Sequence, residues 1–210
     1  MIRTLILMAA LLAATPVTAG PALSKTAPVI TILGDSITAG LGLPEAEAAP
    51  AQLQAALKTM GVDAVVRGAG VSGDTTAGGL ARVDFSVQPD TRVCVVELGA
   101  NDYLQSVDPR LMQANLVGII RRLKARHIRV VLTASATPRA GSGAYGRAFD
   151  AVFPAVARQE RVALAGDLLV GVEDKIALKQ ADGLHPNAAG VKIIAARLAA
   201  VVARVLKTGS

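Results

Sequence analysis

Five short apolar runs, each followed by a stretch with helical spacing, place the strongest constraint on how this chain can fold. The runs occupy residues 28–36, 62–70, 91–102, 128–135 and 161–169. Helical patterns separate the runs and close the chain, at residues 44–61, 74–85, 108–127, 144–160 and 186–207. Strands that alternate with helices form a parallel sheet between two helix layers, and strands covered on both faces are continuously apolar. The sequence therefore predicts an α/β fold, a three-layer αβα sandwich around about five parallel strands.

Residues with known preferences for helix ends mark several of these boundaries. Asp108 is a typical N-cap residue, and Pro109 follows it at the first turn, where proline is favoured. Gly61 is typical of the position that ends a helix. Asp74 is a candidate cap for the glycine-interrupted helix that follows it. These residues support the alternation of strands and helices.

The first residues of the chain have the composition of a secretory signal peptide. Arg3 provides a basic start, residues 5–14 are an unbroken apolar run, and Ala19 ends a small-residue cleavage signal. A membrane anchor is the alternative, but a span needs about 20 apolar residues, and Pro16 interrupts the run before that length is reached. We therefore expect a cleaved signal peptide at residues 1–19 and a periplasmic or secreted protein.

The remaining residues 20–210 are enough for one domain with a hydrophobic core. Loss of the signal peptide removes one basic residue, which lowers the formal net charge from +6 to +5. The densest basic stretch, residues 121–129, lacks nearby aromatic side chains, so we interpret it as a solvated helix end and expect no nucleic-acid partner. Cys94 is the single cysteine, which excludes a disulfide within the chain, and its apolar surroundings predict a buried, unreactive thiol.

Small and polar residues follow the first three predicted strands at the point where each strand ends. Ser36 follows the first strand, Gly73 the second and Asn101 the third. In parallel sheets of this kind, ligands bind outside the carboxyl ends of the strands. With a strand order of 2-1-3-4-5, Ser36 lies between the loop of Gly73 and Asn101. The segment 181–186, which contains His185, precedes the last helix and falls on the same edge of the sheet.

These residues have the chemistry that acyl transfer needs. The Ser36 hydroxyl becomes a nucleophile when a base removes its proton, and His185 is a suitable base. Asp182, three residues earlier, can accept the other ring N–H of that histidine and fix its tautomer. The Ser36 N–H, the Gly73 N–H and the side-chain amide of Asn101 are candidate donors to an oxyanion. This chemistry requires neither a metal nor a cofactor.

Each of these residues also has an ordinary structural interpretation. Ser36 can cap the helix that follows it, residues 101–102 can form a turn, Asp182 can cap a loop, and His185 can be a surface histidine. Four segments that supply complementary roles at one edge of the sheet favour the catalytic interpretation. His127, where a basic helix gives way to a strand, has no such neighbours, and we interpret it as structural.

The candidate site residues and the sequence around them resemble the SGNH, or GDSL-type, hydrolases. Four sequence blocks carry the resemblance, in the family's order: GDSITAG at residues 34–40, GVSGDTT at 70–76, LGAND at 98–102 and DGLHPNAAG at 182–190. The second block looks most like the branch of bacterial arylesterases and multifunctional acyl-CoA thioesterase I/lysophospholipase enzymes, which are secreted to the periplasm. The resemblance implies a flavodoxin-like fold, a Ser-His-Asp mechanism without metal, and broad ester specificity.

Two segments depart from the pattern of that branch. An aromatic residue often precedes the proline of its first helix, where this chain has Ala49 before Pro50, and residues 136–146 replace a more proline-rich loop. We expect both segments to shape the acyl pocket, so the sequence leaves the preferred acyl-chain length open. The chain is also distinct from the α/β-hydrolases, because Thr38 occupies the place of the second glycine of G-x-S-x-G.

The function that we expect is hydrolysis of carboxylic esters or thioesters through an acyl-enzyme on Ser36, by a monomer that acts on small acyl substrates. Two alternatives remain. One is a carbohydrate acetyl esterase with the same mechanism, although aromatic residues, at 2%, are few for a sugar-binding platform. The other is a non-catalytic periplasmic binder of small ligands, since a fold alone does not establish a reaction.

Overall fold

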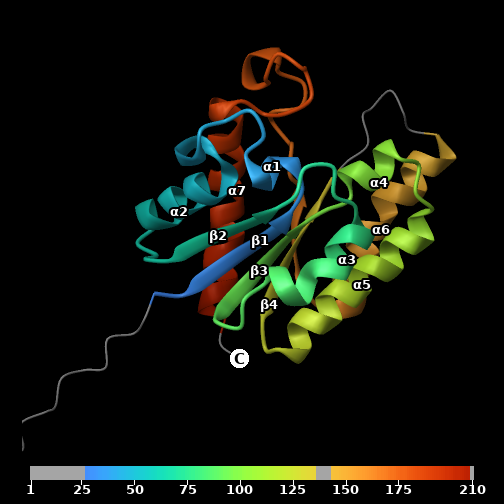
Figure 1. The fold of residues 1–210 in the computed structure, drawn as a ribbon, viewed down its shortest axis with the longest axis horizontal. Coiled ribbons are helices and arrows are strands. Elements are labelled where there is room, and N and C mark those ends of the chain that lie inside the picture. The colour runs from blue at the N-terminus through green and yellow to red at the C-terminus, as the bar shows by residue number, and fades with distance from the viewer. Residues whose placement is uncertain (1–26, 136–142, 209–210) are drawn as a thin grey trace, which may run out of the picture.

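A five-stranded parallel sheet in the order β2-β1-β3-β4-β5 forms the centre of the fold (Figure 1). The strands are β1 (Val29–Gly34), β2 (Val65–Gly70), β3 (Thr91–Glu97), β4 (Arg129–Ala134) and β5 (Ala163–Asp167). Every neighbouring pair is parallel. The structure is a computed structural model that describes residues 27–135 and 143–208. It confirms the predicted fold class and strand order.

Helices cover both faces of this sheet. They are α1 (Ser36–Ala39), α2 (Ala49–Thr59), α3 (Thr76–Ser86), α4 (Ala100–Leu104), α5 (Pro109–Ala125), α6 (Ala144–Glu160) and α7 (Ala188–Lys207), with 3-10 turns η1 (Glu45–Glu47) and η3 (Ile176–Leu178). Helices α2 and α7 lie on one face, and α3, α5 and α6 lie on the other (Figure 1). The short helices α1 and α4 follow the carboxyl ends of β1 and β3.

The two faces of the sheet each have a hydrophobic core, and alternate residues of the central strand supply both. Val93 and Val95 pack among residues of α2 and α7, whereas Cys94 and Val96 pack among residues of α5 and α6. This alternation follows from the two-residue period of a strand. Cys94 is fully buried, and burial raises the pKa of its thiol to about 12, so the thiol is protonated and unreactive at neutral pH.

Burial on both faces holds for the central strands but not for β2, which lies at the edge of the sheet. Val65 is 43% exposed at the start of this strand. The Val66 N–H points away from β1, to the side of β2 that has no neighbouring strand. It donates to Oε1 of Gln54 in α2, at 2.9 Å. A side chain from α2 thus satisfies part of the edge that the sheet leaves unpaired.

Two of the predicted helix boundaries are correct. Asp108 caps α5 by accepting a hydrogen bond from the Arg110 N–H at 2.8 Å, with Pro109 in the first turn. Gly61 follows the end of α2 with a positive φ of 75°, a conformation that glycine adopts without strain.

Two other predictions about the helices are wrong. The segment 44–61 is not one helix, because α2 begins only at Ala49. Pro50 has no N–H to donate to an earlier carbonyl, so it is tolerated in the first turn of a helix but not in its interior. Asp74 does not cap α3, since the Thr75 side chain accepts from the Gly78 N–H instead.

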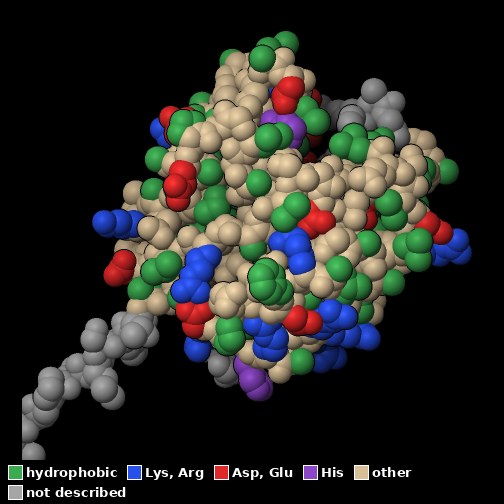
Figure 2. All heavy atoms as spheres, viewed as in Figure 1, with side chains coloured by type: hydrophobic (Ala, Val, Ile, Leu, Met, Phe, Trp, Pro, Cys, Tyr) green, Lys and Arg blue, Asp and Glu red, His purple; other side chains and the backbone are tan. Residues whose placement is uncertain are grey.

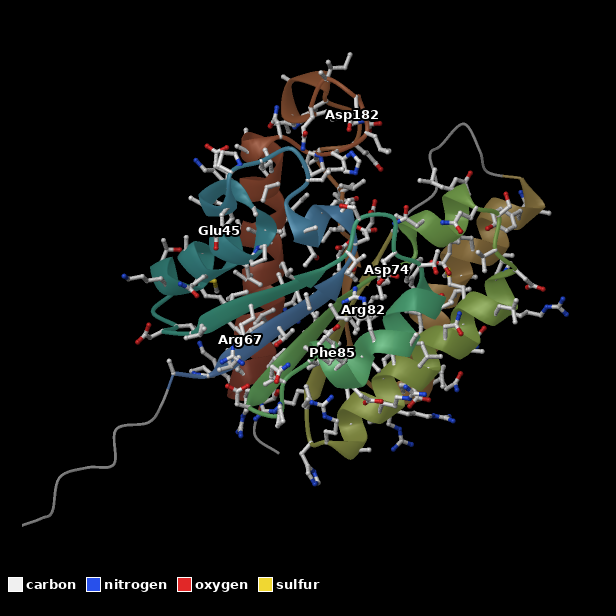
Figure 3. All side chains as sticks on the ribbon, in the orientation of Figure 1. Glu45, Arg67, Asp74, Arg82, Phe85 and Asp182 are labelled. Carbon is white, nitrogen blue, oxygen red and sulfur yellow. The ribbon has the colours of Figure 1, made fainter. Side chains whose placement is uncertain are left out.

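The basic stretch 121–129 makes contacts within the protein. Arg121 and Lys124 pair with Glu160, and Arg122 and Arg126 pair with Asp84. Lys and Arg side chains gather at the lower end of the view in Figure 2, away from the loop that carries Asp182 in Figure 3. The contacts agree with our interpretation of a helix end.

Within residues 27–135 and 143–208, no helix has the length and the apolar composition needed to cross a membrane. The predicted signal peptide, residues 1–19, lies outside the described residues, as does most of the atypical loop at 136–146.

The two phenylalanines Phe153 and Phe85 provide a test of the core. Phe153 is fully buried and packs edge to face on Phe149, whereas Phe85 is 85% exposed. We expect Phe153→Ala to lower the free energy of unfolding by about 3–5 kcal/mol, because it leaves a cavity. Phe85→Ala should change it by less than about 0.5 kcal/mol. Urea denaturation measures both values, and equal losses for the two variants would contradict this description of the core.

Candidate active site

The carboxyl ends of the strands bring Ser36 and His185 together. Ser36 is the first residue of α1, directly after β1, and His185 lies in the segment between β5 and α7. The Ser36 Oγ and the His185 Nε2 are 2.8 Å apart, although 149 positions separate the two residues in the chain. Figure 3 shows Asp182 on the loop that extends beyond this end of the sheet. The structure therefore places the predicted nucleophile within hydrogen-bond distance of the predicted base.

The turn between β1 and α1 holds Ser36 in place. Asp35 caps α1, and its Oδ1 accepts a hydrogen bond from the Ile37 N–H at 3.1 Å. Gly40 ends the helix in the left-handed conformation, with a φ of 72°. Ser36 therefore lies at the N-terminus of a single helical turn that is fixed at both ends.

Three hydrogen bonds join Asp182 to the segment that contains His185. Asp182 Oδ2 is 2.6 Å from the His185 Nδ1, while Oδ1 accepts from the backbone N–H groups of Leu184 at 2.9 Å and His185 at 3.0 Å. The hydrogen bond with the imidazole is the main cause that lowers the pKa of Asp182 to about 2. An ionised carboxylate at this position accepts a hydrogen bond from Nδ1–H, which keeps the proton on Nδ1 and leaves Nε2 free to accept from the Ser36 hydroxyl.

The side chain of Asn101 connects the loops that carry the other predicted oxyanion donors. Its Nδ2 donates to the Asp74 carbonyl oxygen at 2.9 Å and to the Asp35 Oδ2 at 3.2 Å. Asp35 precedes Ser36 and Asp74 follows Gly73, so the Asn101 amide lies between the two backbone segments. Gly73 has a φ of 82°, and among the described residues no atom outside its immediate chain neighbours lies within 4 Å of where a Cβ would be. A positive φ of this size is strained for residues with a side chain, so the backbone conformation favours glycine at this position.

An ion pair beneath these loops ties the ends of two strands together. Arg82 Nε is 2.7 Å from the Asp74 Oδ2, and both side chains are largely buried. The Arg82 guanidinium also donates to the carbonyl oxygens of Ala69 in β2 and Gly34 in β1. Figure 3 shows Arg82 reaching from α3 toward Asp74. Asp74 therefore stabilises the site by this ion pair instead of capping the helix.

Two buried acids, Asp35 and Glu97, lie at the nucleophile turn and were not among the predicted site residues. Asp35 is 2% exposed and Glu97, the last residue of β3, is 6% exposed. Burial raises the pKa of both carboxyl groups, most strongly for Glu97, whose pKa the negative charge of Asp35 raises further. An ionisable residue at the end of an otherwise apolar strand was the signal that could have identified Glu97.

A third buried acid, Asp102, holds the start of α3. Its Oδ2 accepts from the Thr76 N–H at 2.8 Å and its Oδ1 from the Thr76 hydroxyl at 2.6 Å. Asn115 in α5 donates to the same hydroxyl at 3.1 Å. Asn101 and Asp102 thus form part of helix α4 and not an isolated turn, and each fixes a different neighbouring loop.

The site opens to the surface at the carboxyl end of the sheet. Ser36 and His185 share a small crevice with apolar side chains that include Leu41 and Leu43. In Figure 2 the surface is hollowed at this end of the molecule, beside a histidine side chain.

His127, the other histidine of the chain, lies outside this site. It is exposed at the junction of α5 and β4, where the strand begins. In the part of the chain that the structure describes, no group of three or more histidine, cysteine or acidic side chains is arranged to hold a metal ion.

Comparison with known proteins agrees with the four sequence blocks. Residues 32–193 match the GDSL-like Lipase/Acylhydrolase family. The chain is 38% identical over 161 residues to esterase TesA from Pseudomonas aeruginosa, which covers 76% of this chain and 80% of that protein. It is 34% identical over 165 residues to thioesterase 1/protease 1/lysophospholipase L1 from Escherichia coli K12, which covers 78% of each chain.

A solved structure gives the same result. The psychrotrophic esterase EstA from Pseudoalteromonas sp., inhibited by monoethylphosphonate, has a TM-score of 0.79 and 28% identity, over 86% of this chain and 99% of that one. The fold, the four blocks and the relatives agree, and the chain belongs to the GDSL-like lipase/acylhydrolase family, the SGNH hydrolases.

Proposed function

We propose that this SGNH hydrolase cleaves carboxylic esters or thioesters of small acyl substrates through an acyl-enzyme on Ser36. The observation that carries the proposal is the continuous chain of hydrogen bonds from the Ser36 Oγ through the His185 ring to the Asp182 carboxylate, at 2.8 and 2.6 Å. A serine, a base and a carboxylate in this arrangement form a catalytic triad. The names of the relatives, which include esterase, thioesterase and lysophospholipase, support this substrate class.

In the first half of the reaction, His185 Nε2 takes the proton of the Ser36 hydroxyl while Oγ attacks the carbonyl carbon. The imidazolium that forms is stabilised by the Asp182 carboxylate at Nδ1. The tetrahedral intermediate then collapses, and Nε2 returns its proton to the leaving alcohol or thiol. In the second half, Nε2 takes a proton from water, the hydroxide attacks the acyl carbon, and the acid leaves as Ser36 regains its proton.

The oxyanion of both tetrahedral intermediates needs hydrogen-bond donors. We assign this role to the Ser36 N–H, the Gly73 N–H and the Asn101 side-chain amide. The contacts of the Asn101 amide with residues next to Ser36 and Gly73 support this assignment. In the free enzyme both hydrogens of the Asn101 amide are already hydrogen-bonded, so one of these two contacts is exchanged for the oxyanion during the reaction.

The location and assembly of the protein complete the proposal. The composition of residues 1–19 supports cleavage of a signal peptide and a periplasmic or secreted enzyme. Residues 20–210 form one SGNH domain that acts as a monomer and requires no cofactor. Nucleic acid and a stably inserted membrane segment have no part in this mechanism.

The Ser36 hydroxyl provides the most direct test of the reaction. We expect Ser36→Ala to abolish hydrolysis of p-nitrophenyl acetate while its circular dichroism stays that of the wild type. Treatment of the wild type with an ethyl p-nitrophenyl phosphonate should form a bond between the Ser36 Oγ and phosphorus with release of p-nitrophenolate, and peptide mass spectrometry should locate the single adduct on Ser36. A protein that merely binds small ligands would form no adduct, and full activity of the Ser36→Ala variant would exclude the proposed nucleophile.

The Asp182→Asn variant tests the role of the carboxylate. Because the pKa of Asp182 is lowered to about 2, the carboxylate stays ionised above about pH 4. The stability that it contributes is present above the pKa of an unfolded aspartate, about 3.9, and is lost as the pH falls toward 2. We expect kcat/KM of the variant to fall by up to about 10,000-fold, because the asparagine favours the wrong imidazole tautomer.

The pH profile of the same variant gives a second readout. Removal of the negative charge destabilises the imidazolium, so the acidic decline of kcat/KM should move to lower pH. A decline that stays at the wild-type pH, or moves to higher pH, would contradict an interaction between the Asp182 carboxylate and the catalytic base.

Asn101→Ala removes one proposed oxyanion donor. We expect kcat to fall by roughly 100- to 1,000-fold with little change in KM, because the donor acts mainly in the transition state. Asn115→Ala is the matched control, since Asn115 also donates a side-chain hydrogen bond but does so to Thr76, in the supporting network. Steady-state kinetics with one ester substrate compares the two variants, and equal losses of kcat would argue against a role for Asn101 at the oxyanion.

A further inference from the structure

Two buried carboxyl groups lie under the turn that carries Ser36, and the proposed mechanism gives neither of them a role. A buried ionisable group costs free energy unless hydrogen bonds compensate it. Asp35 directly follows β1, Glu97 ends the adjacent strand β3, and the register pairs Gly34 with Glu97. The cost of burying two acids beside the nucleophile suggests that their contacts serve the reaction.

Glu97 binds the nucleophile turn on both sides of Ser36. Its Oε2 accepts from the Thr38 hydroxyl at 2.7 Å and from the Asp35 N–H at 3.2 Å. Asp35 precedes Ser36, and Thr38 follows it by two residues, so a single oxygen fixes the segment from both ends. Thr38 itself is 3% exposed, which keeps these hydrogen bonds away from water.

Gly34 makes this approach possible. A Cβ at this position would lie 2.2 Å from the Thr38 Oγ1 and 2.4 Å from the Glu97 Oε2. Both distances are far shorter than any van der Waals contact, so a side chain here would separate the glutamate from the turn. The glycine that opens the GDSITAG block therefore admits the buried carboxyl beneath the serine.

Asp35 extends these contacts to the proposed oxyanion donor. Its Oδ2 accepts from the Asn101 Nδ2, while its Oδ1 caps the helix of Ser36. An amide nitrogen carries two hydrogens, and in Asn101 they are directed at Asp35 and at the Asp74 carbonyl oxygen. The orientation of the Asn101 amide is thus set by a carboxylate whose own position depends on Glu97.

The charge of the acid pair also matters to an oxyanion nearby. Two buried carboxylates in contact do not both ionise, because desolvation and mutual repulsion favour retention of a proton. Burial and the neighbouring Asp35 raise the pKa of Glu97 more strongly than burial raises that of Asp35, so Glu97 is the member of the pair that more readily retains a proton. Retention of that proton limits the negative charge close to the developing oxyanion, while the Glu97 Oε2 still accepts from the Asp35 N–H.

We propose that Glu97 is a positioning residue of the hydrolytic reaction, a buried carboxyl that fixes the turn of Ser36 and, through Asp35, the Asn101 amide. The inference rests on the proposed function, because it assigns to Glu97 the alignment of the nucleophile with the oxyanion donor. Misalignment by about 1 Å at a reacting centre can cost about 100-fold in rate. Glu97 touches no substrate atom and acts only through its neighbours.

Three variants test this role. Glu97→Leu removes the acceptor, and we expect kcat to fall about 100-fold with a small change in KM. Glu97→Gln keeps a carbonyl oxygen for Thr38 and Asp35, resembles the neutral acid in shape, and should restore most of the lost kcat. Thr38→Val removes only one hydroxyl without loss of volume, and we expect a fall in kcat of about 10-fold.

Glu160 offers a matched control, because it is also 6% exposed but lies at the end of α6, paired with Arg121 and Lys124. Glu160→Leu should lower the free energy of unfolding and leave kcat of the folded enzyme unchanged. For each variant, urea denaturation measures stability, and the rate of phosphonate addition to Ser36 reports alignment independently of substrate turnover. We expect the rate of phosphonate addition to fall together with kcat in Glu97→Leu and Thr38→Val. In Glu97→Gln and Glu160→Leu we expect both rates to stay near those of the wild type.

The outcomes separate this inference from the proposed function. A folded Glu97→Leu variant that loses stability but keeps wild-type kcat and phosphonate rate would overturn the positioning role, while a Ser36 adduct in the same experiment would leave the proposed function intact. Absence of an adduct in the wild type would overturn the proposed function itself. If Glu97→Leu does not fold, Thr38→Val decides, and an unchanged kcat in that variant overturns the inference.

Discussion

The contact between the Ser36 hydroxyl and the His185 ring depends on the direction of the strands. Because every strand of the sheet is parallel, all the carboxyl ends lie at one edge, and the loops that follow them meet there. Ser36 leaves the second strand in spatial order, Asn101 follows the central strand, and the segment of His185 arrives after the strand at the far edge. An antiparallel arrangement would distribute the same residues over both ends of the molecule. The hydrophobic cores on the two faces of the sheet therefore contribute to function, because they hold the carboxyl ends of the strands in fixed positions relative to one another.

Charge is distributed unequally in this site. The carboxylate that faces solvent, Asp182, has a lowered pKa and remains ionised, which suits a partner for an imidazolium. The carboxyls under the nucleophile turn are buried and have raised pKa values, with Glu97 the more strongly shifted. Negative charge is thus available on the side of the base and limited on the side of the proposed oxyanion. The same residue type serves both sides because its surroundings, and not its chemistry, decide its ionisation.

The sequence predicted those features that depend on local pattern. The caps at Asp108 and Gly61 and the residues of the four blocks are encoded within short segments. The strand order is a property of the whole sheet, and its prediction was supported by the resemblance to a flavodoxin-like fold. Asp182 and His185 were predictable as a pair, because they lie three positions apart in one loop. The role of Glu97 was not predictable, because its partners lie about sixty positions away and the register of two strands brings them together. Asp74 was misassigned for a different reason: its partner Arg82 lies only eight positions away, on the next helix, and binds the carboxylate in an ion pair, while Thr75 caps the helix.

A crystal structure of the protein after reaction with an ethyl phosphonate would test the central claim most directly, because the phosphonyl group imitates the tetrahedral intermediate. The account predicts phosphorus bonded to the Ser36 Oγ, with one phosphonyl oxygen about 2.7–3.1 Å from the Gly73 nitrogen and the Asn101 Nδ2. Phosphorus bonded to another residue, or an oxygen directed away from both donors, would contradict it.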